Sequence, residues 1–557
     1  MSNLIIKNGI VFDPINNISG EKKDLLIEAG KIVDKFKHNN SKDVKSIDAS
    51  GKTVIPGAID IHTHIASQQT NNIRLLGSKN KEFLQFWNGL TLDYLTKEYI
   101  SKGYTFIVEA NVFPSLAKQT IFNFDQIPIL DKAMLINASN LWSLELEYQK
   151  GDIEKLSVFI SDLLDLIKGF GLKIYNPFEA EEWDFKEIRD DLSTSGRLYN
   201  LSAMDVFRNM TKTVENIGLP HSIHAHIDGY ESEIGQSNAF KVLEDIKTQG
   251  LAPSQSGQTK IKRSQIFHLA HASAYSFNDN TKLINFFNSN DNFDLDLGFM
   301  NFCPINPLIT SDRRLINQLY DGTSSKSHPI IKGAIESEGD HFETFRILKK
   351  DNLHYCTIWA NALSLALGIK DKWKMQFSIN FPNYAHLTDI PEIISWLLNK
   401  NIRDKFTDDM NHDFKQDNPL LNIEDTFSIN DLIIITRASP AKSLGLGDIK
   451  GNLGSGADAD INILNINLQE KDSASQIDEI KKAFSDIDTV IKNGIIVKQG
   501  ETINLNHKGA LFWSKGIVNT QNYEKIMDKK KEFYKKYSSI FYESLKPNTD
   551  KIKLIKI

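Results

Sequence analysis

Two histidines, His62 and His64, close a short apolar run that extends from Val54 to Ile61. Side chains at positions i and i+2 of a β-strand point to the same face, so the two imidazoles can reach one metal ion. The run is apolar and rich in β-branched residues, which is typical of a strand buried on both faces of a parallel sheet. Parallel barrels carry their catalytic side chains at the carboxyl ends of such strands. The run therefore predicts a metal site at the mouth of a barrel.

Strand-like and helix-like segments alternate through the middle of the chain, which predicts βα units around a parallel sheet. Counting the first run, eight segments have the character of core strands: residues 54–61, 104–109, 133–137, 171–175, 222–226, 265–271, 293–297 and 375–379. Eight such strands predict a TIM-type (β/α)8 barrel. Residues from about 311 to 360 show no clear pattern, and we expect insertions there.

Both ends of the chain have short apolar segments separated by turn signals, a pattern that predicts hairpins. The sequence Lys-Asn-Gly-Ile occurs at 7–10 and again at 492–495. We therefore expect residues 1–55 and 430–505 to meet in one small composite β-sandwich. The metal-dependent barrel would then occupy residues 56–429, and residues 506–557 would form a C-terminal, partly helical extension.

Composition narrows the class of protein. The chain has 557 residues, a formal net charge of -6 and two cysteines. This charge gives no general attraction to nucleic acid or to an anionic membrane. Two cysteines are too few for a disulfide framework or a thiolate zinc site. No apolar stretch reaches the roughly 18–20 residues of a membrane span, and the first residues lack a signal-peptide pattern. We expect a cytoplasmic protein without a nucleic-acid or membrane partner.

The histidines are unevenly placed. Seven of the 14 lie at the ends of three predicted strands: His62, His64, His221, His224, His226, His268 and His271. Imidazole nitrogen is a good ligand for zinc and similar divalent metals. A metal ion with an open coordination position can activate water for hydrolysis near neutral pH.

Several segments together resemble the amidohydrolase superfamily: the N-terminal Lys-Asn-Gly hairpin, residues 54–64, and residues 454–460. More narrowly, the chain resembles the A-type subunit of formylmethanofuran dehydrogenase and of its bacterial counterpart, the formyltransferase/hydrolase complex. The matching segments, in the order of that family, are residues 64–66, 171–177, 218–226 and 434–442.

The resemblance implies a set of site residues. His62 and His64 would bind one metal, and a carboxylated Lys173 would bridge two divalent metal ions, with zinc as the expected metal. A carbamate offers two oxygens, whereas an ammonium group cannot ligate a metal. His226 and His271 would complete the ligands. Residues expected just behind the ligands or near the substrate are His224, His268 and His386.

The sequence departs from the superfamily at the eighth strand, where an aspartate is expected and this chain has Asn380. An amide is neutral and cannot act as a general base. His386 and Asp389 are alternative bases, and the sequence does not choose between them. From the sequence we expect that Asn380→Asp raises both metal binding and hydrolysis.

The resemblance implies an enzyme of one-carbon metabolism that hydrolyses or forms the formyl-amide bond of formylmethanofuran. Methanofuran would be the substrate carrier, and the chain would work with the other subunits of the complex. Two alternatives stay open. The order of ligands also fits a free-standing cyclic amidohydrolase of the dihydropyrimidinase or dihydroorotase type. The amide at Asn380 also fits a non-catalytic structural subunit that keeps the barrel.

Overall fold

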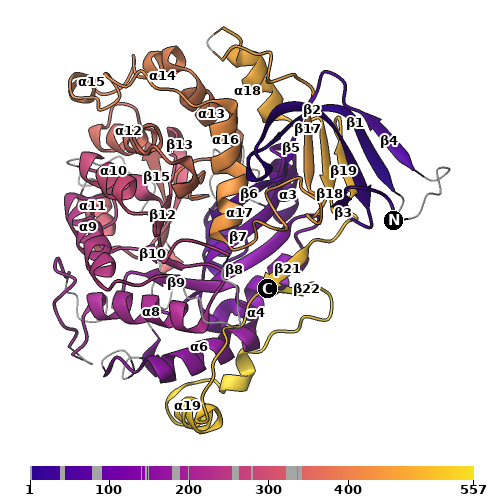
Figure 1. The fold of residues 1–557 in the computed structure, drawn as a ribbon. Helices are drawn as coiled ribbons and strands as arrows, with labels where there is room; N and C mark the ends of the chain where they lie inside the picture. Colours follow the sequence, from indigo (N-terminus) through magenta and orange to yellow (C-terminus); the bar gives the residue numbers. More distant parts are fainter. Residues whose placement is uncertain are drawn as a thin grey trace.

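A barrel and a second sheet, built from both ends of the chain, dominate the structure (Figure 1). The computed structural model describes residues 3–557 except 38–43, 78–90, 140, 145–146, 148–149, 178–187, 198–199, 254–261, 278–279, 322–334, 337–341 and 474. Within these described residues, every helix is too short or too polar to cross a membrane.

The barrel is built from eight parallel strands in the described part of the chain. They are β6 (Ala58–Thr63), β7 (Tyr104–Val112), β8 (Asp131–Asn137), β9 (Gly171–Tyr175), β10 (Ile223–His226), β11 (Phe267–Leu269), β12 (Phe293–Asp296) and β16 (Met375–Gln376). A parallel bridge between Thr63 and Phe381 joins the first strand to the segment after the last. The N–H of His64 also donates to the carbonyl of Phe381 at 2.8 Å. The predicted barrel is confirmed.

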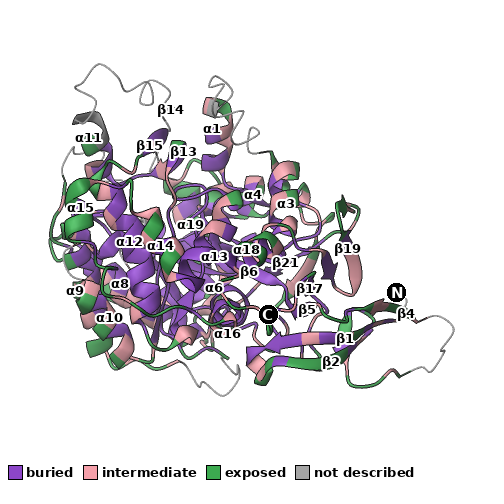
Figure 2. Cartoon of the chain, turned by 90° about the horizontal axis from the view of Figure 1, so that it is seen from above, coloured by how far each residue is buried: buried purple, intermediate pink, exposed green. Residues whose placement is uncertain are grey.

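Helices alternate with these strands and pack around them (Figure 1). They are α1 (Gln68–Gly77), α3 (Leu92–Ser101), α4 (Ala117–Asp125), α6 (Ile153–Ile167), α8 (Ala203–Ile217), α9 (Glu233–Thr248), α10 (Asn280–Ser289), α11 (Arg313–Asp321), α12 (Leu353–Gly368) and α13 (Ile390–Leu398). The ends of α8 illustrate the local signals. A capping box of Ser202 and Asp205 starts the helix, and Gly218 ends it in the left-handed conformation. The barrel strands are buried, and the outward faces of the helices are exposed (Figure 2).

Short helices connect the barrel to the second sheet. After α13 the chain forms α14 (Lys400–Phe406), α15 (His412–Gln416), α16 (Ile429–Ile433) and α17 (Ser439–Ser443). A π-helical turn, Ile434–Ala438, lies between the last two. Within it Arg437 donates from Nε to the carbonyl of Pro56 at 2.8 Å, which ties this segment to the start of the barrel.

The second sheet has nine strands in the described residues, drawn from both chain ends (Figure 1). They are β1 (Leu4–Asp13), β2 (Ile18–Glu28), β3 (Lys31–Val33), β4 (Lys45–Asp48), β5 (Thr53–Pro56), β17 (Ile461–Leu464), β18 (Thr489–Lys492), β19 (Ile495–Gln499) and β20 (Thr502–Ile503). The ends join where β5 pairs antiparallel with β17. Helix α18 (Ile477–Ser485) lies in the connection between β17 and β18. The division of the chain into three domains stays a prediction.

The structure differs from the sequence expectation at two strands. The apolar run 54–61 is not one strand, because it divides at Gly57 into β5 of the second sheet and β6 of the barrel. A Cβ at Gly57 would lie 2.3 Å from Oγ1 of Thr105, so the close approach at this bend requires glycine. The predicted hairpin turn at Asn8 is instead a bulge within the continuous strand β1, with Asn8 at a φ of 59°.

The segment without a clear sequence pattern contains an antiparallel insertion between β12 and β16. Its described strands are β13 (Cys303–Thr310), β14 (Ile335–Glu336) and β15 (Phe342–Leu348). The C-terminal extension adds β21 (Ala510–Trp513) beside β8 and β22 (Lys553–Lys556) beside β21. Helix α19 (Tyr523–Tyr537) lies between these two strands.

Candidate metal centre

The carboxyl ends of the barrel strands surround one buried cavity. Its described lining contains His62, His64, Lys173, His226, His271 and Asn380, together with Gln69, Asn111, Tyr175, Tyr230, Ile309, Thr310 and Asn383. The first six, which the sequence singled out, are each at most 8% exposed. They come from strands that are far apart in the sequence, and the barrel brings them together.

Two carboxylates fix the rings of His62 and His64. Nδ1 of His62 lies 3.2 Å from Oδ2 of Asp296, and Nδ1 of His64 lies 3.2 Å from Oε1 of Glu109. Such contacts set the ring orientation and leave Nε2 for a metal. Burial, with the nearby charge of Lys173, lowers the pKa of His62 to about 3. His62 is therefore neutral at pH 7, as a metal ligand must be.

His226 and His271 face each other across the cavity, with Nδ1 of His226 2.9 Å from Nε2 of His271. Among the described residues, Nε2 of His226 and Nδ1 of His271 are buried without a hydrogen-bond partner. Burial, followed by the neighbouring histidines, lowers the pKa of both rings well below its ordinary value. Buried polar atoms are usually paired, so neutral rings with unpaired nitrogens fit a metal-binding role.

Lys173 lies on β9 between Asn137 of β8 and His224 of β10 in the strand register. Its side chain is buried, and this burial lowers the pKa of Lys173 to about 7, against the opposing charge of Asp296. A substantial fraction of the amine is therefore neutral near pH 7. A neutral amine is the form that can add carbon dioxide to give a carbamate.

His271 and Asn380 share an unusual backbone conformation. Their φ angles are 33° and 43°, in the left-handed region that non-glycine residues rarely occupy. Backbone strain of this kind concentrates at functional sites, where surrounding contacts hold it in place. Gly298 lies close to one of the two, because a Cβ on it would be 2.6 Å from Cβ of His271.

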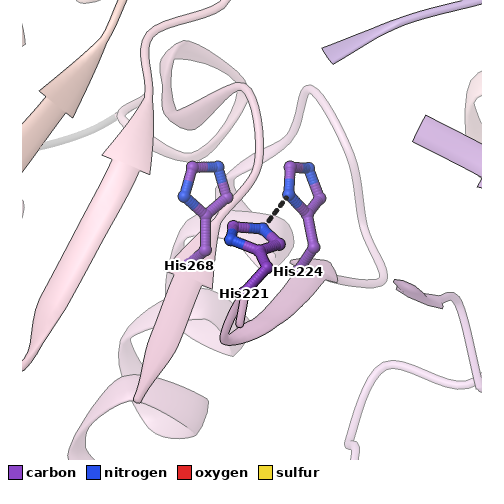
Figure 3. Close-up of side chains that lie close together, drawn as sticks. All are labelled: His221, His224 and His268. Atoms are coloured by element: carbon purple, nitrogen blue, oxygen red, sulfur yellow. Dashed lines mark hydrogen bonds between the residues drawn. The ribbon is translucent and has the colours of Figure 1, made fainter. Parts of the chain in front are cut away.

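Three further histidines lie beneath the cavity inside the barrel (Figure 3). Nε2 of His221 is 3.2 Å from Nδ1 of His224, and Nε2 of His224 is 3.0 Å from Nδ1 of His62. His268 contacts Asp294 at 2.9 Å and Asp296 at 3.1 Å. His224 and His268 therefore support the ring of His62 and its carboxylate, which is the place expected for them.

His386 lies elsewhere. It precedes a short 3-10 turn, Leu387–Asp389, and its Nδ1 is 2.6 Å from Oγ1 of Thr388. The described residues that line the cavity do not include it. Asp389 likewise accepts from the N–H of His386 at 2.7 Å, as part of the same turn.

Some residues of the site were not found from the sequence. Asp294 and Asp296 alternate on one predicted strand, and Glu109 ends another, so the same strand-end argument that selected the histidines would have selected them. Tyr230 follows β10 by four residues and carried no comparable signal. Its ring centroid lies 5.0 Å from that of His226 and 5.1 Å from that of His271.

Comparisons with known proteins agree with this geometry. An amidohydrolase family model matches residues 364–498. The chain belongs to the amidohydrolase superfamily. It is 29% identical over 522 residues to "Protein FwdA" of Methanocaldococcus jannaschii, covering 90% of this chain and 88% of that protein. It is 24% identical over 510 residues to the A-type subunit of the formyltransferase/hydrolase complex of Methylorubrum extorquens, covering 87% and 88%.

One solved structure has the same fold over the whole chain. It is the formyltransferase/hydrolase complex of Methylorubrum extorquens in complex with methylofuran. The TM-score is 0.85 at 21% sequence identity, and the match covers 100% of this chain and 99% of the other. The amidohydrolase fold therefore accounts for both the barrel and the second sheet.

Proposed function

We propose that the chain is the hydrolytic subunit of a formylmethanofuran dehydrogenase or formyltransferase/hydrolase complex. It would hydrolyse or form the formyl-amide bond of formylmethanofuran, with methanofuran as the carrier. The near full-length similarity to two curated subunits of this kind supports the proposal. The same similarity favours it over a free-standing cyclic amidohydrolase.

The donor set fits a pair of divalent metal ions. His62, His64, His226 and His271 offer neutral imidazoles, and a carboxylated Lys173 would bridge the two ions. Nitrogen and carboxylate oxygen at an open site suit zinc. When bound, such ions lower the pKa of water and polarise a carbonyl group.

The reaction exchanges one bond for another. In hydrolysis the C–N bond of the formyl amide breaks, the formyl carbon gains OH from water to give formate, and the amine nitrogen gains a proton. In the reverse direction formate and amine lose water. The buried walls of the cavity keep bulk water away from this exchange, and Tyr175 and Tyr230 offer flat surfaces for the substrate beside His226.

Asn380 stands at the cavity but cannot take a proton from water, because its amide is neutral. The site then lacks the aspartate that is expected as base, and hydrolysis is expected to be slower than in relatives that have it. The buried, unpaired nitrogens of His226 and His271 carry the proposal of a working metal site, because a barrel kept only for structure does not need them.

Formate release from formylmethanofuran tests this function. We would purify the full chain with its co-purifying subunits, remove metal with a chelator, and restore zinc. The proposal expects formate release that is lost on chelation and recovered with zinc, in proportion to bound metal. His62→Ala should abolish the recovery, whereas His412→Ala, a change at an exposed histidine, should not. A complex that holds metal but releases no formate would favour a purely structural role for the chain.

A further inference from the structure

A directional chain of hydrogen bonds runs from the β13 backbone into the cavity. The N–H of Ile309 donates to Oδ1 of Asn383 at 2.8 Å. Nδ2 of Asn383 donates to Oδ1 of Asn380 at 3.3 Å, and Nδ2 of Asn380 donates to the hydroxyl oxygen of Tyr230 at 3.2 Å. All four residues line the cavity, and the three side chains are buried.

The first donor fixes the direction of the whole chain. A backbone N–H can only donate, so the oxygen of Asn383 must face Ile309 and its NH2 must face Asn380. Asn380 therefore presents its oxygen to Asn383 and its NH2 to Tyr230. The oxygen of Tyr230 consequently acts as acceptor at its contact with Asn380. The single hydroxyl proton of Tyr230 remains available for another acceptor.

The backbone of Asn383 is held as well, which keeps the start of the chain in place. Its carbonyl accepts from Nδ2 of Asn306 at 2.6 Å and from Nη2 of Arg346 at 3.1 Å. Arg346 is itself paired with Glu231, the residue that follows Tyr230. Both ends of the hydrogen-bond chain are therefore anchored to the same buried ion pair.

We infer that Tyr230 donates a hydrogen bond to the carbonyl oxygen of the formyl group, and that Asn380 is the positioning residue that orients Tyr230. This inference rests on the proposed function. The ring of Tyr230 lies beside His226 and His271, so its hydroxyl is close to the reacting bond. A donor aimed at an oxygen that gains negative charge in the transition state lowers the barrier.

The inference reverses the meaning of Asn380. A carboxylate at this position would accept a hydrogen bond, and it would draw the proton of Tyr230 towards itself and away from the substrate. The amide leaves that proton for the cavity. Asn380→Asp is therefore expected to lower hydrolysis, which is opposite to the expectation from the sequence alone.

The test compares steady-state formate release from formylmethanofuran by the wild-type chain, with its co-purifying subunits, and by variants in the same complex. Tyr230→Phe keeps the ring and removes the donor. It should lower kcat per bound metal by about 10²-fold, the usual effect of losing one such donor, and leave KM within a few-fold. Asn380→Asp should lower kcat in the same way. The double variant should be no slower than Tyr230→Phe, because both changes remove one interaction.

Tyr104→Phe is the matched control, because Tyr104 is a buried tyrosine at the opposite end of strand β7. Its kcat should equal that of the wild type. Thermal melting would show whether each variant is folded, and metal analysis would show that the ligands are intact. An active wild type with unchanged Tyr230→Phe, or with a faster Asn380→Asp, overturns the inference alone. A metal-loaded wild type without formate release overturns the proposed function and the inference together.

Discussion

Asp296 connects the floor of the barrel to the candidate metal centre. One of its oxygens lies within 3.2 Å of both His62 and His268, and the other accepts from the hydroxyl of Ser378. The contacts with the two histidines hold the pKa of Asp296 well below its ordinary value, although burial alone would raise it. Asp296 therefore stays ionised and can orient His62 at any pH near neutrality.

Asp296→Asn is expected to weaken metal binding, because the amide is neutral and orients the ring of His62 less strongly. Loss of an outer partner of a ligand typically costs about 10–100-fold in metal affinity. Competition with a chromophoric zinc chelator would measure this change. Asp291→Asn, on the exposed turn before β12, is the control and should bind zinc as the wild type does. Equal zinc affinity in the two variants would remove Asp296 from the account of the site.

At the scale of elements, the barrel strands followed from the sequence because each is a short apolar segment bounded by turn signals. The division of the run 54–61 did not, since both halves are equally apolar and only the close approach of Gly57 to Thr105 separates them. The hairpin of β13 and β15 was also missed. Its residues mix buried and exposed positions without a regular period, as expected for a strand pair that covers a cavity rather than a core.

The candidate site was predicted to a similar extent. The ligands were found because imidazoles at strand ends are a strong signal, whereas Tyr230, Thr310 and Asn383 lie on connecting segments, where sequence spacing says little about position. The direction of the hydrogen bonds around Asn380 depends on one backbone N–H of Ile309, which no sequence pattern reveals.

Arg346→Met tests what holds the hairpin over the cavity. Arg346 on β15 donates through Nη1 to both carboxylate oxygens of Glu231, at 2.8 and 2.9 Å, and both side chains are fully buried. Removing one partner of such a pair leaves a buried charge, so we expect a loss of roughly 3–5 kcal/mol in the free energy of unfolding. Chemical denaturation would measure it. Glu231→Gln with Arg346→Met should cost less than the sum of the two single variants.

The same pair should make stability depend on pH. Burial would raise the pKa of Glu231, but the charge of Arg346 lowers it from 4.5 to about 2. A lowered pKa in the folded state means that the stabilisation is present above pH 4.5 and is lost as the pH falls towards 2. The difference in stability between wild type and Arg346→Met should shrink over this range. Arg208→Met, which breaks a half-exposed pair with Asp245, should change stability by less than about 1 kcal/mol.

At the scale of the whole molecule, a buried charge cluster joins the barrel to the second sheet. Asp131 at the start of β8 contacts both Lys450 and Lys492 at 2.5 Å, and each lysine also contacts Asp460 at 2.6 Å. Burial alone would raise the pKa of Asp131, but the two lysines hold it well below its ordinary value. The cluster therefore keeps two layers of opposite charge in register where the chain ends meet the barrel.

Asp131→Asn should destabilise the whole protein, because it leaves two buried ammonium groups short of negative charge. We expect a loss of roughly 3–5 kcal/mol, seen as a lower melting temperature by calorimetry. Asp409→Asn, at an exposed pair with Lys350, should stay within about 1 kcal/mol of the wild type. A melting temperature for Asp131→Asn equal to that of the control would mean that the cluster does not stabilise the junction.

The most direct test of the central claim is the amount of divalent metal bound per chain, measured by mass spectrometry on the full chain with its co-purifying subunits after zinc supplementation. If the six converging residues form a two-metal centre, the wild type should hold about two ions. Lys173→Ala should hold fewer than one, and Lys132→Met, at an equally buried lysine at the other end of the barrel, should hold as many as the wild type. A wild type without bound metal, or a Lys173→Ala variant that keeps two ions, would contradict the account.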